Sequence, residues 1–226
     1  MDKSEWNRKV AISRWKNLLA KQVSQIPNDK DSLLIKAGIC GLLAGDGSVQ
    51  YRKAGTFYRY QLDFFPDDDI MLKTYCEFMQ KIYSSKPAIT RKNNYYVVRL
   101  SLKFIAQDLL KECKFGIYTW DLPNTLLSID GAKELWLRGF FSAEGYVNKK
   151  YIKTQSVNIK GMQKVSSLLT DLGIPNRTYE YTPKNPNHSK VLMLFILSKE
   201  ARIQYCKKIG FWHSKKERLL KESLGL

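Results

Sequence analysis

The fold is decided by the stretch ICGLLAGDG, which occupies residues 39–47. A closely similar stretch, LRGFFSAEG, occupies residues 137–145. Both are apolar segments with small residues four positions apart, and both end in an acid followed by glycine. The two acids, Asp46 and Glu144, are separated by about 100 residues, which is the size of one small domain. We therefore expect each stretch to open one half of a duplicated protein.

Small residues form a stripe along each of these segments. Gly41 and Gly45 are four positions apart, as are Gly139 and Ala143, so each pair lies on one side of a helix. A glycine inside a helix costs about 1 kcal/mol relative to alanine. Close approach of a second backbone explains such a cost, because larger side chains would keep the two helices apart. We expect the two helices to be each other's partner.

The glycines after the acids, Gly47 and Gly145, predict helix ends with a left-handed residue at each. Asp46 and Glu144 would then lie at helix C-termini, where the helix dipole disfavours an acid. Two carboxylates brought together there repel each other unless a cation lies between them, so a metal site is the natural explanation. The alternative is two ordinary buried helices that each end in an exposed acid. It fits one copy well but two copies at domain spacing poorly.

The two stretches resemble the LAGLIDADG signature of homing endonucleases, in the single-chain form that carries two signatures. The resemblance covers roughly residues 33–222. It implies that Asp46 and Glu144 bind divalent cations, Mg²⁺ above all, and that the backbone carbonyls of Gly45 and Ala143 complete the coordination. It also implies hydrolysis of both DNA strands, which leaves short 3′ overhangs.

The composition indicates a globular protein with a polyanionic partner. Hydrophobic residues make up 44% of the 226, and the formal net charge is +17 at a pI of about 9.7. Nucleic acid is the first candidate for that partner, and an anionic membrane surface is the second. No apolar run is long enough for a transmembrane helix, and the N-terminus has no signal-peptide core. We expect an intracellular monomer, in the cytoplasm, the nucleoid or an organelle matrix.

The cysteines and histidines show no zinc-binding pattern. The four cysteines are far apart in the sequence, and only His188 and His213 could join them as ligands. We expect reduced, packed thiols at Cys40, Cys76, Cys113 and Cys206.

The expected organisation is an extension followed by two repeats. Residues 1–30 form a basic helical extension that packs on the body or contacts DNA, and its acids Asp2 and Glu5 argue against a targeting peptide. Residues 31–124 and 125–226 form the repeats. In each repeat the hydrophobic periodicity predicts helix, two strands, helix, two strands, helix. The fold class is α+β, with two pseudo-symmetric repeats whose antiparallel sheets form a DNA-binding saddle and whose signature helices join them.

Capping residues help to place the helices. Asp29 and Ser32 predict the start of the first signature helix, the run 67–69 predicts another start, and Ser101 is a candidate cap. The expected hairpins span residues 48–64, 86–102, 146–158 and 177–197. Besides the two signature helices, the expected helices span residues 70–83, 102–113, 161–172, 198–209 and 215–224.

The polar alternates of these hairpins are the candidate DNA contacts, because a two-stranded ribbon fits the major groove, where Arg suits guanine and Gln suits adenine. In the first repeat they are Ser48, Gln50, Arg52, Arg59, Gln61, Asp63, Arg91 and Arg99. In the second they are Asn148, Lys150, Lys153, Gln155 and Arg177. Since the two sets differ, we expect an asymmetric target. The alternative for any one of them is a solvated strand residue.

The family resemblance also implies a basic residue near each metal, after the last helix of each repeat. In the second repeat, Lys215 and Lys216 fit this place and are the candidate catalytic lysines. In the first repeat the corresponding residues 119–121 include no lysine, and Lys114 is close by in sequence. A solvated helix start is the alternative explanation for the lysines.

The sequence therefore predicts a site-specific double-strand DNA endonuclease that recognises a long site and works by divalent-metal-assisted phosphodiester hydrolysis. Two alternatives keep the fold. One is an RNA-binding intron maturase. The other is a non-catalytic DNA-binding regulator, a class in which the acids are typically lost.

Overall fold

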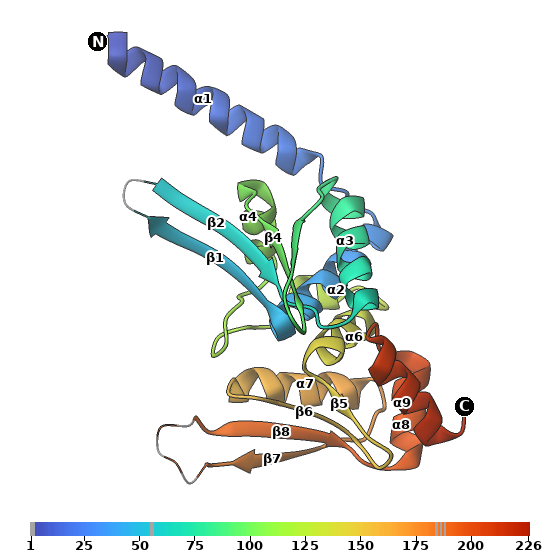
Figure 1. Ribbon diagram of the computed structural model, residues 1–226. Coiled ribbons are helices and arrows are strands. Elements are labelled where there is room, and N and C mark those ends of the chain that lie inside the picture. The colour runs from blue at the N-terminus through green and yellow to red at the C-terminus, as the bar shows by residue number, and fades with distance from the viewer. Residues whose placement is uncertain (1–2, 55–56, 184, 186, 188) are drawn as a thin grey trace.

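The computed structural model describes residues 3–54, 57–183, 185, 187 and 189–226, and for residues 3, 52–54, 57 and 58 it describes the backbone alone. Two repeats follow an N-terminal helix, α1 (Figure 1). The first repeat contains α2 (Lys30–Asp46), β1 (Gly47–Ala54), β2 (Phe57–Phe64), α3 (Asp69–Tyr83), β3 (Ala88–Arg91), β4 (Tyr96–Leu100) and α4 (Lys103–Glu112). The second contains α6 (Ala132–Glu144), β5 (Tyr146–Val147), β6 (Ile152–Ser156), α7 (Ile159–Asp171), β7 (Arg177–Tyr181), β8 (Val191–Ile196) and α8 (Lys199–Lys208).

The described residues include three further helices. They are α1 (Lys3–Ser24), the short α5 (Asn124–Leu127) between the repeats, and α9 (Ser214–Leu224). The predicted order of helix, two strands, helix, two strands, helix is confirmed in both repeats, and the α+β class with it.

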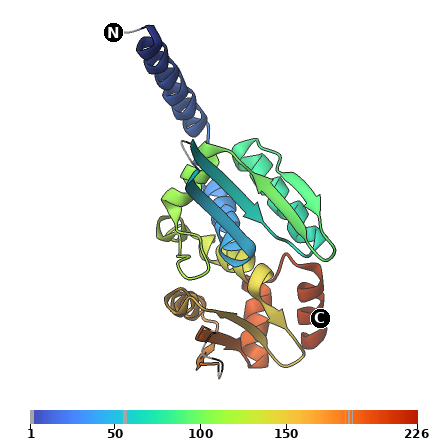
Figure 2. The ribbon, with the colours of Figure 1, turned by 60° about the vertical axis from the view of Figure 1, so that its left-hand side comes forward.

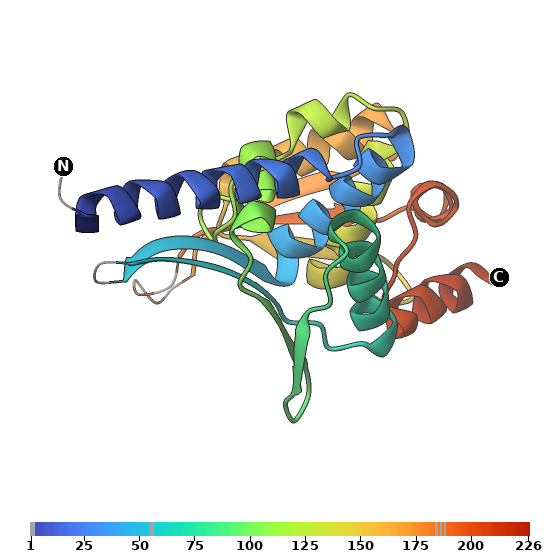
Figure 3. The same cartoon turned by 90° about the horizontal axis from the view of Figure 1, so that it is seen from above.

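Each repeat folds into a four-stranded antiparallel sheet, and the strand order is the same in both: β1-β2-β4-β3 in the first and β5-β6-β8-β7 in the second. The cross-strand pairs Val49–Leu62 and Val147–Ile152 are buried, and they define the face of each sheet that packs on helices. Seen from above, helices α2, α3 and α4 lie on one side of the bent first sheet (Figure 3). The other face of each sheet carries most of the polar alternates.

The helix starts follow the predicted caps, with one exception. The side chains of Asp29 and Asp68 accept backbone hydrogen bonds at the starts of α2 and α3. Ser198, for which no capping role was predicted, does the same for α8. The expectation for Ser101 is wrong, because Leu102 is the N-cap of α4 and makes no side-chain capping bond.

The glycines that follow the acids are not left-handed, so that expectation is also wrong. Gly47 has φ −128° and Gly145 has φ −74°, and both are extended. The reason for glycine is space. A Cβ on Gly47 would lie 2.8 Å from the Leu43 carbonyl oxygen, and one on Gly145 would collide with the carbonyl oxygen of Phe141. In each repeat, the backbone therefore passes directly from the signature helix into a strand. It runs so close to the last helical turn that a side chain would not fit.

Helix α1 projects away from the body (Figures 1 and 2). Its residues are mostly exposed, including Trp6 and Trp15, while Leu19 packs against the core. The ammonium group of Lys103, on α4, lies 5.4 Å from the centre of the Trp15 ring. The extension is therefore a helix held to the body near its C-terminal end.

No helix in the described ranges is long and apolar enough to cross a membrane. The four cysteines, all of them described, are free thiols, and Cys40 and Cys113 are buried. Of the two histidines, His213 is buried and His188 lies outside the described residues.

Candidate active site at the helix junction

The two signature helices cross with their backbones in contact. A Cβ on Gly41 would collide with the carbonyl oxygen of Trp136, and one on Gly139 would lie 2.7 Å from the carbonyl oxygen of Gly38. The stripe of small residues therefore lets α2 and α6 approach closely, and the expectation that they are partners is confirmed.

This crossing brings the two acids together. A Cβ on Gly45 would collide with that of Ala143 and would lie 3.3 Å from Cγ of Glu144. Asp46 and Glu144 are the last residues of α2 and α6, so they occupy equivalent places in the two repeats. Each repeat contributes one carboxylate to the same small region.

The electrostatics of the two acids reflect this closeness. Partial desolvation of the Glu144 carboxyl group and then the negative charge of Asp46 raise the Glu144 pKa to about 7, although Lys216 opposes the shift. Desolvation also raises the pKa of Asp46, against the charge of Lys216. Glu144 remains open to solvent along one pocket of about 430 Å³, which it lines with Tyr146, Tyr151 and Lys153.

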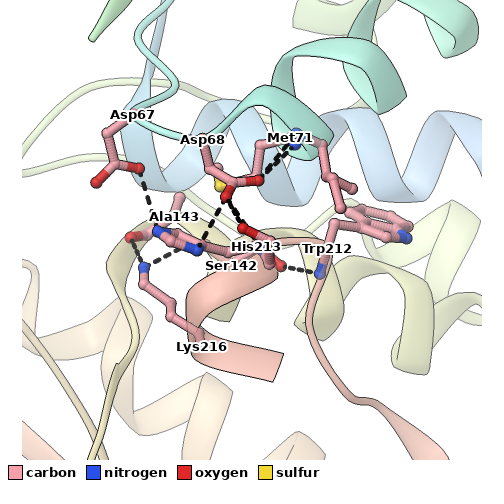
Figure 4. Close-up of polar contacts among 10 residues, drawn as sticks. Asp67, Asp68, Met71, Ser142, Ala143, Trp212, His213 and Lys216 are labelled. Atoms are coloured by element: carbon pink, nitrogen blue, oxygen red, sulfur yellow. Dashed lines mark hydrogen bonds and ion pairs between the residues drawn. The ribbon is translucent and has the colours of Figure 1, made fainter. Parts of the chain in front are cut away.

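Lys216 lies against the last turn of α6, next to Ser142 and Ala143 (Figure 4), and its charge acts on both acids. Its ammonium group donates hydrogen bonds to the carbonyl oxygens of Ser142, at 2.6 Å, and Ala143, at 2.7 Å. Desolvation lowers the Lys216 pKa, while nearby carboxylates, including Asp46 and Glu144, act in the opposite direction. The structure thus brings Lys216 to the junction, whereas the neighbouring Lys215 is exposed on α9.

The first repeat has no counterpart of Lys216 at the place that the sequence suggested. Lys114 is exposed, and its charge acts on Asp121, which also forms an ion pair with Lys164 at 2.5 Å. Among the described lysines, Lys216 is the one whose charge acts on both acids, and it comes from the second repeat.

A second group of polar side chains, missed in the sequence, joins the repeats next to the acids. Asp68 caps α3 and also accepts hydrogen bonds from the backbone N–H and the hydroxyl group of Ser214 (Figure 4). The imidazole Nε2 of His213 lies 3.5 Å from an Asp67 oxygen, and this hydrogen bond lowers the Asp67 pKa. The run of acids at 67–69 was the available signal, but it indicated only a helix start.

The junction offers the donor set of a hard cation. Carboxylate and backbone carbonyl oxygens are the ligands that Mg²⁺ and Ca²⁺ prefer. Asp46 and Glu144 supply the carboxylates, and because desolvation raises the pKa of both, a bound cation would stabilise their charged forms. Among the described residues no group of three or more His, Cys, Asp or Glu side chains could hold a metal, so backbone oxygens would have to contribute. The residues present therefore fit a divalent cation.

The predicted DNA contacts of the first repeat share one face of its sheet, with one exception. Cross-strand pairing puts Ser48 opposite Asp63 and Gln50 opposite Gln61, while Asp63 also pairs with Arg99. Arg59 is paired with Arg52, whose side chain lies outside the described residues. Arg91 pairs with Tyr96 and lies on the opposite face, with its guanidinium group 6.0 Å from that ring.

Asp63 is already engaged within this face. Its carboxylate is buried, accepts a hydrogen bond from Gln61 at 2.5 Å and forms an ion pair with Arg99 at 2.7 Å. Its charge is therefore compensated inside the protein.

In the second repeat, Lys153, Gln155 and Arg177 share the uncovered face, since Lys153 and Arg177 both pair with Phe195. Asn148 instead shapes a turn, where its side-chain oxygen accepts hydrogen bonds from the backbone N–H groups of Lys150 and Tyr151. Lys150 is exposed at this turn. The structure thus brings three of the five predicted residues together on one sheet face.

These features define a class of duplicated α+β protein, in which two repeats join along glycine-bearing helices that end in a pair of acids. Residues 132–210 match the family of the LAGLIDADG-like domain. The second half of the chain therefore carries this domain, and the resemblance to the LAGLIDADG homing endonucleases is confirmed at the level of the fold.

Two solved structures illustrate that fold. The structure of I-DmoI in complex with DNA and Mn matches with a TM-score of 0.62 at 22% identity, over 79% of this chain and 97% of that chain. The structure of I-WcaI bound to its DNA recognition sequence matches with a TM-score of 0.57 at 14% identity, over 92% of each chain. At these identities the likeness concerns the fold alone.

A curated relative is also similar in sequence. It is a DNA polymerase of Thermococcus kodakarensis, 25% identical over 216 residues, an alignment that covers 88% of this chain. The chain spans 12% of the length of that relative.

Proposed function

We propose that this protein is a site-specific endonuclease that cuts both strands of duplex DNA with a divalent cation. One observation carries the proposal: Asp46 and Glu144, one from each repeat, lie together at the ends of two crossing helices, with Lys216 beside them. One acid from each repeat suits one cut in each strand. Family resemblance adds that the product has short 3′ overhangs.

Duplex DNA is the partner that the charge and the sheets support. The net charge of +17 favours binding to a polyanion. The I-DmoI and I-WcaI structures, which share this fold, contain DNA. We propose that the uncovered faces of both sheets follow the major groove. The contacts would come from Ser48, Gln50, Arg59, Gln61, Asp63 and Arg99 in one half-site, and from Lys153, Gln155 and Arg177 in the other, with Asn148 and Lys150 at the turn. Because these sets differ, the target would be asymmetric.

In this proposal, different groups of the chain have different roles at the junction. Asp46 and Glu144, with the backbone carbonyls of Gly45 and Ala143, would hold the cation, which we take to be Mg²⁺. When bound, such a cation supplies charge neutralisation at the phosphate and a more acidic water. Lys216 would hold positive charge beside the scissile phosphate, where charge develops in the transition state. Since the first repeat lacks a matching lysine in the described region, the two cuts would not be equivalent.

We also propose that the chain acts as an intracellular monomer, because one chain supplies both acids and its thiols are free. It would divide into the extension 1–30 and the repeats 31–124 and 125–226.

The test begins with a search for the target. Duplexes bound by the full chain would be selected from a random-sequence library, and then incubated with wild type, Asp46→Asn or Glu144→Gln, with and without Mg²⁺. Wild type is expected to cut only with the metal, and the variants are expected to bind without cutting. Asp130→Asn, which changes an exposed acid far from the junction, is the matched control and should cut like wild type.

Two results would contradict the proposal. One is tight duplex binding by wild type with no cutting in any divalent metal, which would leave a DNA-binding regulator. The other is preferential binding to structured RNA, which would favour a maturase. Binding should also weaken with salt, by roughly 0.9 log units per log unit of salt for each phosphate contacted.

A further inference from the structure

A continuous strip of aromatic rings crosses the uncovered face of the second sheet. It starts at Tyr146, the second residue after Glu144, and passes through Tyr151 and Phe195 to Tyr179 at the far edge. Successive ring centres are 6.1, 5.5 and 5.7 Å apart. Tyr146 and Tyr179 are 55% and 47% exposed, whereas the hydrophobic residues on the other face of the sheet belong to the buried core. The strip is therefore a solvent-facing apolar surface on the face that carries the proposed DNA contacts.

The first sheet is hydrophilic at the same positions. The pairing register establishes the equivalence, because Ser48–Asp63–Arg99 in the first sheet corresponds to Tyr146–Lys153–Phe195 in the second. Continuing the register outward makes Gln61 the equivalent of Tyr151, and Thr90 the equivalent of Tyr179. The four aromatic residues thus stand where the first repeat has Ser48, Gln61, Arg99 and Thr90. The two sheets share their geometry but present different chemistry.

Two cations flank the strip. The ammonium group of Lys153 lies 5.7 Å from the centre of the Phe195 ring, and Arg177 pairs with Phe195 from the neighbouring strand. Such cations contact phosphates, which position a protein on a duplex without reading its sequence. Besides these two cations, this face offers to the bases Gln155, which suits adenine, and the four rings.

We propose that the aromatic strip reads its half-site through the C5-methyl groups of thymines in the major groove. This inference rests on the proposed function, in that it takes duplex DNA as the ligand of the sheets. The thymine methyl group is the one apolar group that base pairs present in that groove. Apolar rings recognise it by excluding water, whereas Gln61 and Arg99 in the first sheet are suited to hydrogen bonds with base edges.

The arrangement of the rings favours methyl groups over stacked bases. Tyr146 and Tyr151 are tilted by 43°, Tyr151 and Phe195 meet at 71°, and Phe195 and Tyr179 meet at 77°, so no two successive rings of the strip are parallel. Unpaired bases of RNA or single strands stack on open ring faces. Rings that pack edge to face present no series of parallel faces, but together they form a broad apolar surface.

Deoxyuridine provides a direct test, because it lacks the methyl group of thymidine and keeps every hydrogen-bonding atom. The full chain with Asp46→Asn and Glu144→Gln would be used to select a duplex, and its affinity would be measured with deoxyuridine in place of all thymidines of one half-site or of the other. We expect one half-site to lose about fourfold in affinity for each contacted methyl group, and the other to change by less than about twofold. Equal sensitivity of both half-sites, sensitivity of neither, or a selected half-site without thymine would overturn the inference.

Variants of the strip assign the effect to this surface. Tyr179→Thr with Phe195→Arg installs the residues of the first sheet, and should abolish the difference between thymidine and deoxyuridine duplexes. Tyr179→Phe tests the ring against its hydroxyl group and should keep the difference, as should the matched change Thr90→Ser in the first sheet. A thermal melt of each variant confirms folding. If the deoxyuridine effect persists in the double variant, another surface reads the methyl groups and the inference is wrong.

The same preparations separate this inference from the proposed function. Cutting of the unmodified duplex by wild type with Mg²⁺ reports on the nuclease alone. Deoxyuridine sensitivity without cutting would keep the inference and reject the nuclease, and cutting without sensitivity would do the reverse. Tighter binding to a single-stranded or hairpin RNA than to the duplex, lost in Tyr179→Thr, would replace methyl recognition by base stacking.

Discussion

The ammonium group of Lys216 donates a 2.7 Å hydrogen bond to the carbonyl oxygen of Ala143, the last residue but one of the second signature helix. A positive charge from the last helix of the chain is thereby fixed at the point where the two repeats meet. The same carbonyl is one of the oxygens proposed to hold a cation. Lys216 and the cation would therefore act within one small region.

The first prediction concerns this lysine. If the proposed function holds, Lys216→Met should slow cutting of the selected duplex by about 100- to 1000-fold, because it would remove a preorganised charge beside the scissile phosphate. Binding should change by less than about threefold, since many other cations of the proposed DNA-binding surface would remain. Single-turnover cutting rates and affinities measured on the same duplex check both parts.

Lys215→Met is the matched comparison, because its side chain is exposed one position away. It should alter the cutting rate by no more than about twofold. If Lys215→Met is the slower enzyme, the assignment of the lysine is reversed. Each strand should be followed separately, since the lack of a matching lysine in the first repeat predicts that Lys216→Met slows one cut more than the other.

The second prediction concerns pH and the stability of the metal-free protein. Glu144 has a pKa of about 7 in the folded chain and an ordinary value of 4.5. Between these values the folded state keeps a proton that the unfolded state has lost, so deprotonation of Glu144 should make stability fall as pH rises through this window. Glu144→Gln should therefore raise the melting temperature at pH 8, by about 2–4 °C for each kcal/mol gained in the free energy of unfolding, and leave it unchanged at pH 4.

Mg²⁺ provides the control for this effect. If the proposed site binds the cation, the cation should raise the melting temperature of wild type at pH 8, because it would bind only the folded chain, and should act less on Glu144→Gln. A variant that melts below wild type at pH 8 would show that the Glu144 charge is not destabilising.

Much of this architecture could be predicted because short, local sequence patterns determine it. Alternation in β2 and β4 predicted the strands, and the spacing of Gly41 and Gly45 predicted a close helix crossing. The same reasoning assigned the wrong role to Gly47 and Gly145. An acid followed by glycine at a helix end has two physical explanations, a left-handed backbone or a lack of space, and the sequence does not distinguish them.

The interactions that the sequence could not predict join distant segments. Ser214 and Asp68 are 146 positions apart, and no local pattern marks them as partners. Arg91 and Arg99 look alike in sequence, but the pairing of β3 with β4 puts them on opposite faces. The aromatic strip likewise becomes visible only when the two pairing registers are compared.

The third prediction tests the helix crossing. Gly139→Ala puts a Cβ 2.7 Å from the carbonyl oxygen of Gly38 and 2.8 Å from the Leu42 nitrogen, so the two backbones must separate. Overpacking of this kind should lower the free energy of unfolding by about 1–3 kcal/mol, measured by urea denaturation. Gln163→Ala, on the exposed face of α7, should have a free energy of unfolding within about 0.5 kcal/mol of wild type. Equal stability of all three proteins would mean that the crossing tolerates a methyl group.

The last prediction concerns an ion pair that the sequence did not reveal. Lys36, on the buried side of α2, lies 2.8 Å from Asp108 on α4, and its side chain is only 5% exposed. The hydroxyl group of Tyr83 donates a 2.7 Å hydrogen bond to the same carboxylate. Lys36→Met should lower the free energy of unfolding by about 3–5 kcal/mol, because it leaves Asp108 charged in an apolar setting.

A second lysine–acid pair supplies the contrast. Lys73 and Glu77 lie 3.8 Å apart on α3, but the Lys73 side chain is 74% exposed, so Lys73→Met should cost no more than about 0.5 kcal/mol. Adding Asp108→Asn to Lys36→Met removes the stranded charge and keeps an oxygen for Tyr83, so the double variant should be more stable than Lys36→Met alone. If it is less stable, the loss comes from packing of the Lys36 stem rather than from the uncompensated charge.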